Sequence, residues 1–101
     1  MLRSVLSLGK PTSICMIYDA IPGLGEAERT ALAGFNDVIT RAAITAGIPL
    51  IDLRVICNHA ADYSPLSPIE PSVIGGAKIA DVICRVVATH DFAKRGTVIY
   101  V

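Results

Sequence analysis

The sequence predicts an α/β fold, a small parallel sheet with flanking helices. Residues 12–18 and 48–53 form apolar runs without polar alternation, which is typical of strands covered on both faces. Between them, residues 26–46 carry apolar side chains at helical spacing and end at Gly47. The two strands of such a strand-helix-strand unit are parallel, and the connection between them through the helix is usually a right-handed crossover. We therefore expect a single α/β domain over residues 1–101.

The composition limits the class of protein. The chain has 101 residues, enough for one core, yet 52% are hydrophobic and only 18% charged. We expect part of this apolar surface to meet a partner. Nine basic and nine acidic residues balance to zero net charge, which excludes the basic surface that nucleic acids require and favours a homo-oligomer.

Further elements flank the predicted strand-helix-strand unit. Residues 2–8 resemble the last turns of a helix ended by Gly9, and residues 97–101 resemble a short strand. Ser72 is suited to cap another helix, and two glycines in its first turn, Gly75 and Gly76, predict that something packs closely there. The predicted apolar stripe of the helix over residues 26–46 consists of Ala31, Leu32, Phe35, Val38, Ile39, Ala42, Ala43 and Ala46. That of the helix that follows Ser72 consists of Ile79, Val82, Ile83, Val86 and Val87.

The cysteines and histidines predict neither a disulfide nor a metal site. Cys15, Cys57 and Cys84 are far apart and lie among aliphatic neighbours, so we expect buried, reduced thiols. His59 follows Cys57 by two residues, but two ligands fall short of a zinc site. We expect no cofactor. No signal peptide and no apolar span of membrane length is present in these residues, which predicts a cytoplasmic location without a membrane span.

Two loops follow the predicted strands at the end where open α/β sheets bind ligands. Residues 19–25 are rich in turn formers, and residues 54–71 form a long loop stiffened by three prolines. We interpret Asp52 and Asp62 as turn-capping surface residues. His90 ends the last helix, where a cationic side chain interacts favourably with the helix dipole. A catalytic role for His90 is the weaker alternative.

Residues 62–80 carry a family resemblance. They resemble the final motif of SGNH/GDSL hydrolases, Asp-Gly-Ile-His-Pro-Ser-x-x-Gly, with matches at Ile69, Pro71, Ser72 and Gly75. The resemblance implies the C-terminal half of a three-layer, flavodoxin-like domain. It also implies ester or acyl hydrolysis by a serine, an oxyanion hole and a base on the last loop.

The chain departs from this family at both catalytic positions of the motif. Ser67 stands at the position of the family's Asp, and Glu70 at that of its His. No Gly-Asp-Ser nucleophile motif occurs, and a glutamate with an ordinary pKa is a weak base toward a hydroxyl. Ser67 and Glu70 are the candidate catalytic residues, and we expect the isolated chain to be inactive, with a small ester as substrate only in a complete domain.

Residues 34–37 spell Gly-Phe-Asn-Asp, similar to the family's oxyanion-hole motif. Because they fall inside a helix with Phe35 on its apolar stripe, we interpret Asn36 as structural. The alternative to a hydrolase segment is a non-catalytic α/β module that self-associates or binds a protein partner. A flavodoxin-like or receiver-like module unrelated to hydrolases is the third interpretation, although such folds need more strands than the two clear ones.

Overall fold

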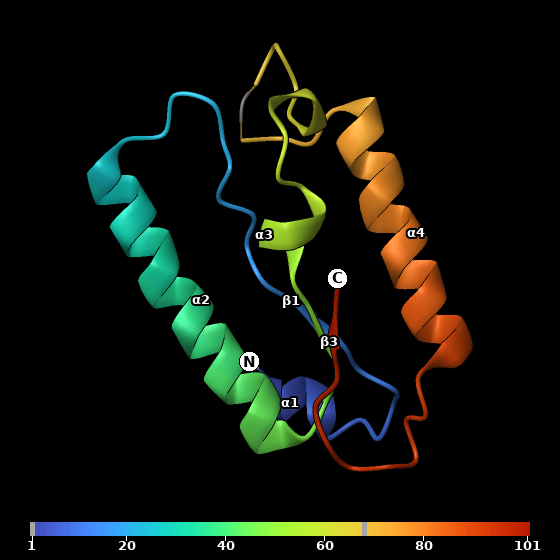
Figure 1. Ribbon diagram of the computed structural model, residues 1–101. Helices are drawn as coiled ribbons and strands as arrows, with labels where there is room; N and C mark the ends of the chain where they lie inside the picture. The colour runs from blue at the N-terminus through green and yellow to red at the C-terminus, as the bar shows by residue number, and fades with distance from the viewer. Residues whose placement is uncertain (1, 68) are drawn as a thin grey trace.

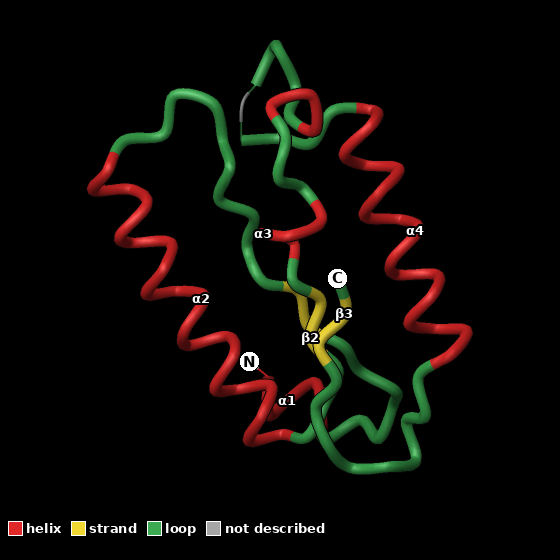
Figure 2. Tube along the Cα trace, viewed as in Figure 1, coloured by secondary structure: helices red, strands yellow, loops and turns green. Residues whose placement is uncertain are grey.

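Three short parallel strands form the middle layer of the protein. The structure is a computed structural model that describes residues 2–67 and 69–101. Its strands are β1 (Ile14–Cys15), β2 (Leu50–Ile51) and β3 (Ile99–Tyr100), in the order β1-β2-β3. Leu50 is level with Ile14 on one side and with Ile99 on the other. The predicted parallel sheet is confirmed, with a third strand at the predicted C-terminal segment (Figure 2).

Helices cover both faces of this sheet. Two long helices lie on opposite sides of the strands in Figure 1, α2 (Glu26–Ala46) and α4 (Val73–Thr89). The predicted helix near the start of the chain is present as α1 (Leu2–Leu6), which lies beside the end of α2. Two more short elements, α3 (Leu53–Ile56) and the 3-10 turn η1 (Ala60–Asp62), follow β2 inside the segment expected to be a loop.

The two residues of β2 divide the core. Successive side chains of a strand point to opposite faces, and both Leu50 and Ile51 are fully buried. Leu50 belongs to the cluster beneath α1 and α2, and Ile51 to the cluster beneath α4. A third cluster, of Ile21, Cys57 and Tyr63, lies among the loops after β1 and β2. The protein therefore has three layers, with β2 at the centre.

The two crossovers of the sheet have opposite hands. The chain steps in one direction, from β1 to β2 to β3, while α2 and α4 lie on opposite faces. Right-handed crossovers in one direction would place both helices on the same face. The connection from β2 to α4 is long and contains α3 and η1, so the strand does not feed its helix directly.

Helix ends follow the sequence signals. Gly47 adopts the left-handed conformation that ends α2, with φ of 67°. The Ser72 hydroxyl accepts a hydrogen bond from the Gly75 N–H at 3.1 Å and caps α4. The predicted close packing is confirmed at Gly75, where a Cβ would collide with the carbonyl oxygen of Asp62. It is wrong at Gly76, which faces open space.

The predicted apolar stripe of α2 is partly wrong. Phe35 and Val38 point outward, with 62% and 64% of their surface exposed, whereas the intervening Asn36 is 1% exposed. Ala43 lies on the inward face as predicted. Because α2 carries apolar residues on both sides, its helical period did not identify the face that packs on the sheet. On α4, Val82 and Val86 are buried, but Ile83, Val87 and Cys84 are exposed, which corrects the predicted stripe and the predicted burial of that thiol.

The two glycines of α4 provide a matched test of this packing. Gly75→Ala is expected to lower the free energy of unfolding by about 2 kcal/mol, because the backbone of Asp62 must move to admit a methyl group. Gly76→Ala is expected to raise it by up to about 1 kcal/mol, because alanine is the better helix former and its methyl group meets nothing. Urea unfolding measures both values. Equal effects at the two positions would contradict the close approach of η1 and α4.

Candidate functional site

The loops after β1 and β2 meet at the carboxyl ends of the strands. The Tyr18 hydroxyl donates a hydrogen bond to the Ile69 carbonyl oxygen at 2.7 Å, which joins the two loops. The Tyr63 hydroxyl donates to the Cys57 carbonyl oxygen at 2.7 Å, and burial raises the Tyr63 pKa to about 12. The two phenol rings pack edge to face, with centroids 5.2 Å apart. Both tyrosines therefore act as fixed donors that hold the loops together.

The two candidate catalytic residues lie in a tight turn of this region. The Glu70 N–H donates to the Ser67 carbonyl oxygen, and the Ser64 N–H donates to the Glu70 carbonyl oxygen, both at 2.9 Å. The Glu70 side chain is exposed. Among the described residues, no imidazole forms a hydrogen bond with the side chain of Ser67 or Glu70. The turn thus brings the two residues close through their backbones, without a proton shuttle.

Asp52 is engaged by its neighbour Arg54. One Asp52 carboxylate oxygen accepts from the Arg54 N–H and Nε at 3.1 and 3.0 Å, and the other accepts from a terminal guanidinium nitrogen at 2.9 Å. The hydrogen bonds from Arg54 outweigh burial and lower the pKa of Asp52. The predicted turn-capping role is confirmed, since Asp52 caps α3, but the predicted surface position is wrong, because the residue is buried.

Asp62 is also buried, which corrects its prediction as a surface residue. Its side chain is 1% exposed; one carboxylate oxygen lies 2.7 Å from Lys78 Nζ, and the other accepts from the His59 N–H at 3.1 Å. The lysine contact is an ion pair without the direction of a good hydrogen bond. The Asp62 carbonyl oxygen accepts from the Ser72 N–H at 2.8 Å. Asp62 therefore joins η1 to the first turns of α4.

The ion pair predicts a dependence on pH. Burial alone would raise the pKa of Asp62, but Lys78 and the His59 N–H outweigh it, and the pKa lies below its ordinary value. Because a lowered folded-state pKa stabilises the fold above the unfolded value of about 3.9, this stabilisation is lost as the pH falls through that range and below. Lys78→Met is expected to lower the free energy of unfolding by about 2 kcal/mol at pH 7 and by less at pH 4.

Urea unfolding at the two pH values tests this expectation. Lys94→Met, which changes an exposed lysine, is the control and is expected to have little effect at either pH. A loss that is the same at pH 7 and pH 4 would show that Lys78 acts through its packing alone.

Asn36 closes the outer edge of the sheet beside β1. Ile14 and Met16 donate their N–H groups to the carbonyl oxygens of Pro49 and Ile51. The backbone groups of Cys15 and Ile17 therefore face away from β2. The Ile17 N–H donates to Asn36 Oδ1 at 2.7 Å, and Asn36 Nδ2 donates to the Ile17 carbonyl oxygen at 2.9 Å. One side-chain amide thus forms the pair of bonds that a neighbouring strand would form. Sequence reasoning placed Asn36 as structural but missed this contact; its helical alignment with Ala43 was the available signal.

The outer edge of β3 is different. Leu50 and Asp52 donate to the carbonyl oxygens of Val98 and Tyr100, so the backbone groups of Ile99 point away from β2. Ile99 finds no backbone hydrogen-bond partner among residues 2–67 and 69–101. Its side chain is 54% exposed. The sheet therefore has one closed edge and one open edge within the described part of the chain.

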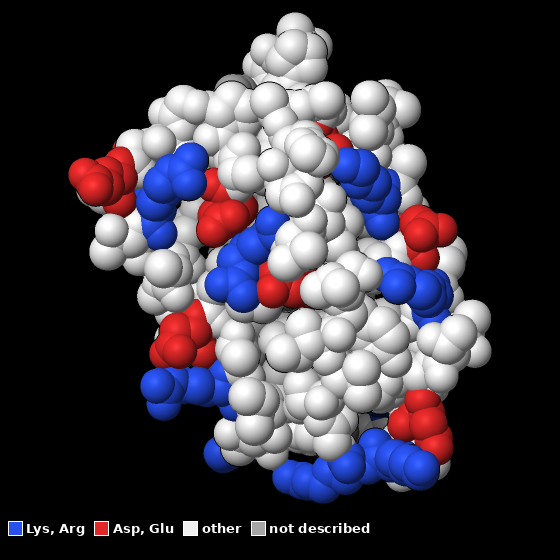
Figure 3. All heavy atoms as spheres, viewed as in Figure 1, with Lys and Arg blue, Asp and Glu red and all other residues white. Residues whose placement is uncertain are grey.

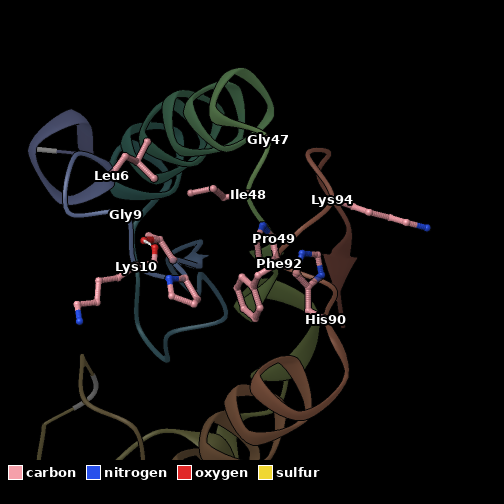
Figure 4. Close-up of a pocket in the computed structure, with 11 residues that line it drawn as sticks. Leu6, Gly9, Lys10, Gly47, Ile48, Pro49, His90, Phe92 and Lys94 are labelled. Atoms are coloured by element: carbon pink, nitrogen blue, oxygen red, sulfur yellow. Dashed lines mark hydrogen bonds between the residues drawn. The ribbon is translucent and has the colours of Figure 1, made fainter.

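His90 lies at the opposite end of the sheet from the loops. It ends α4, as predicted, and its Nδ1 lies 2.8 Å from the Tyr100 hydroxyl oxygen. With Phe92 it lines a cavity of about 200 Å³ next to Pro49 (Figure 4). The lysines at its rim, Lys10 and Lys94, point away from the cavity in this view. His90 thus connects β3 to the end of α4.

Charge and metal-binding chemistry are both limited on the described surface. Acidic and basic side chains are interspersed over most of the face shown in Figure 3. Within the described ranges, no group of three or more His, Cys, Asp or Glu side chains is arranged to hold a metal ion. Nor does any described helix combine the length and apolar character needed to cross a membrane.

Comparisons with known proteins return no match to this chain, whether against protein-family models, curated proteins or solved structures.

Asn36 is expected to be important for stability. Asn36→Ala should lower the free energy of unfolding by about 2 kcal/mol, since it leaves two groups of the Ile17 backbone without their partner. The neighbouring Asp37 makes only an exposed ion pair with Arg41, so Asp37→Ala should cost less than about 0.5 kcal/mol. Thermal unfolding followed by circular dichroism compares the two. Similar midpoints for both variants would contradict the assigned role of Asn36.

Proposed function

We propose that the chain is a non-catalytic α/β module that binds an extended polypeptide segment along the outer edge of β3. The observation that carries this proposal is the difference between the two edges of the sheet. At β1, the Asn36 amide satisfies the Ile17 backbone; at β3, the Ile99 N–H and carbonyl groups face outward without a backbone partner in the described residues. An open strand edge is a template for pairing with another chain.

The sequence of this edge supports the proposal. Residues 97–101 read Thr-Val-Ile-Tyr-Val, entirely β-branched or aromatic residues of high strand propensity. Natural edge strands are protected by charged side chains, by proline, by bulges or by being very short; β3 is only two residues long, but residues 97–101 contain no charged residue, proline or bulge. The residue types of this edge are therefore those of a strand that pairs.

The state of the polar groups also supports a non-catalytic role. The carboxylates of Asp52 and Asp62 are held in ion pairs, and the phenols of Tyr18 and Tyr63 donate to carbonyl oxygens. Ser67 and Glu70 share a turn that contains no described imidazole contact. A serine without a neighbouring base is a weak nucleophile.

The hydrolase interpretation is the alternative proposal, and the geometry favours it less. In a flavodoxin-like sheet of order 2-1-3-4-5, the missing strands of a C-terminal half would pair with the outer edge of its first strand, here β1. Asn36 occupies that edge at Ile17. A strand added there would have to displace the amide, whereas at β3 the Ile99 groups are open among the described residues and Arg85 contacts only the Val101 carbonyl oxygen.

The proposal predicts peptide binding without ester turnover. Protein labelled at the exposed Cys84 and held at nanomolar concentration should bind an acetylated Thr-Val-Thr-Val-Thr peptide saturably in thermophoresis. Ile99→Pro should weaken this binding at least about tenfold, or about 1.4 kcal/mol, because it removes the outward N–H and no bond to β2. A p-nitrophenyl ester should be hydrolysed no faster than in buffer.

Three outcomes would contradict the proposal. The first is an absence of saturable binding, and the second is binding that Ile99→Pro leaves unchanged. The third is ester turnover that Glu70→Gln abolishes, which would restore the hydrolase alternative.

A further inference from the structure

We propose that the occupant of the β3 edge is a second copy of this chain, paired antiparallel through β3 about a two-fold axis at Ile99. This inference rests on the proposed function and specifies its partner. The two sheets would then form one continuous sheet across the interface, in which the parallel strands of each copy meet at a central antiparallel pair. Such a contact is isologous, since the same surface is used by both copies.

The backbone of β3 suits this arrangement. Because the Ile99 N–H and carbonyl groups both point outward, a two-fold axis beside Ile99 lets the two copies of that residue exchange both hydrogen bonds. Thr97 and Val101 have the same outward parity, so Thr97 of one copy would face Val101 of the other. The Val101 carbonyl oxygen already accepts from Arg85 at 2.7 Å, and a carbonyl has a second lone pair for the Thr97 N–H of the second copy.

The side chains are self-complementary in this register. On the face of the sheet that α2 covers, Ile99 of one copy would lie opposite Ile99 of the other. On the face that α4 covers, Val98 of one copy would lie opposite Tyr100 of the other. Pairs of aromatic and β-branched residues opposite one another are favourable across antiparallel strands. Val98, Ile99 and Val101 are about half exposed in the single chain and would be covered by the second copy.

Charge favours a copy of the chain over a charged partner. No residue from 97 to 101 is charged, and Arg85 meets this edge at the Val101 carbonyl oxygen, so the strand offers little to select a basic or acidic peptide. The chain has nine basic and nine acidic residues, and a net charge of zero removes the repulsion that two copies of a charged protein would experience. An uncharged apolar strand is best matched by another of the same kind, and the chain itself supplies one.

Sedimentation velocity over a concentration series tests this inference with the full chain. Wild-type protein is expected to form a dimer. Ile99→Pro, which removes the outward donor, and Ile99→Lys, which places a charge at the two-fold axis, should each raise the dimer dissociation constant at least about tenfold. Val87→Lys introduces the same charge on an exposed apolar position of α4 and should leave the dissociation constant within about twofold of wild type.

A second measurement does not depend on the folding of the variants. Amide hydrogen exchange in the wild-type chain should show that the Ile99 N–H becomes protected as the concentration rises, while Ala31 on the exposed side of α2 keeps its exchange rate. Dimers that Ile99→Pro leaves intact, or an Ile99 exchange rate independent of concentration, would overturn the inference.

The two proposals fail separately. A chain that stays monomeric but binds the Thr-Val-Thr-Val-Thr peptide through Ile99 overturns the inference and keeps the proposed function. A chain that neither dimerises nor binds this peptide overturns both.

Discussion

Backbone hydrogen bonding at the edges of a very small sheet is the constraint on which this structure depends. Among the described strands, β2 alone has a neighbour on both sides, and its residues Leu50 and Ile51 are fully buried. The outward groups of β1 and β3 need other partners, since an unpaired backbone group away from water costs about as much as a lost hydrogen bond. Asn36 meets this need at β1 from within α2. At β3, Arg85 donates to the Val101 carbonyl oxygen, but the N–H and carbonyl groups of Ile99 have no backbone partner among the described residues.

Asp62 is a central contact in the long connection from β2 to α4. Its carboxylate, N–H and carbonyl groups are all engaged, and Gly75 permits the backbone of α4 to approach it. This attachment joins η1 to the first turns of α4, on the face opposite α2. The turn with Ser67 and Glu70 lies in the same connection and makes no hydrogen bond to a described imidazole.

The sequence predicted the elements better than it predicted which way they face. Gly47, Ser72 and Gly75 act through the local backbone, so the helix end, the helix cap and the close packing that they mark could be predicted without knowledge of the tertiary structure. The inward face of α2 could not be predicted, because Phe35 and Val38 make the outer side of the helix as apolar as the inner one. Asp62 was expected at the surface since acidic residues are seldom buried unless paired, and its partner Lys78 is distant from it in sequence. The candidate residues Ser67 and Glu70 were correctly placed on one loop, but their chemistry depends on partners that the sequence pattern does not supply.

The apolar surface of α2 and the edge of β3 are both exposed, yet they carry different weight. Exposed apolar side chains are common on monomeric proteins, because there is not enough polar surface to cover a small domain. Phe35 and Val38 therefore require no partner. A strand edge whose own sequence lacks a charged residue, a proline or a bulge is less common, since its N–H and carbonyl groups recruit other chains. A second strand at Ile99 satisfies these groups and covers apolar side chains in the same step, whereas a partner on α2 would cover side chains alone. For this reason the edge, and not the larger apolar face, is the part of the surface that identifies the partner.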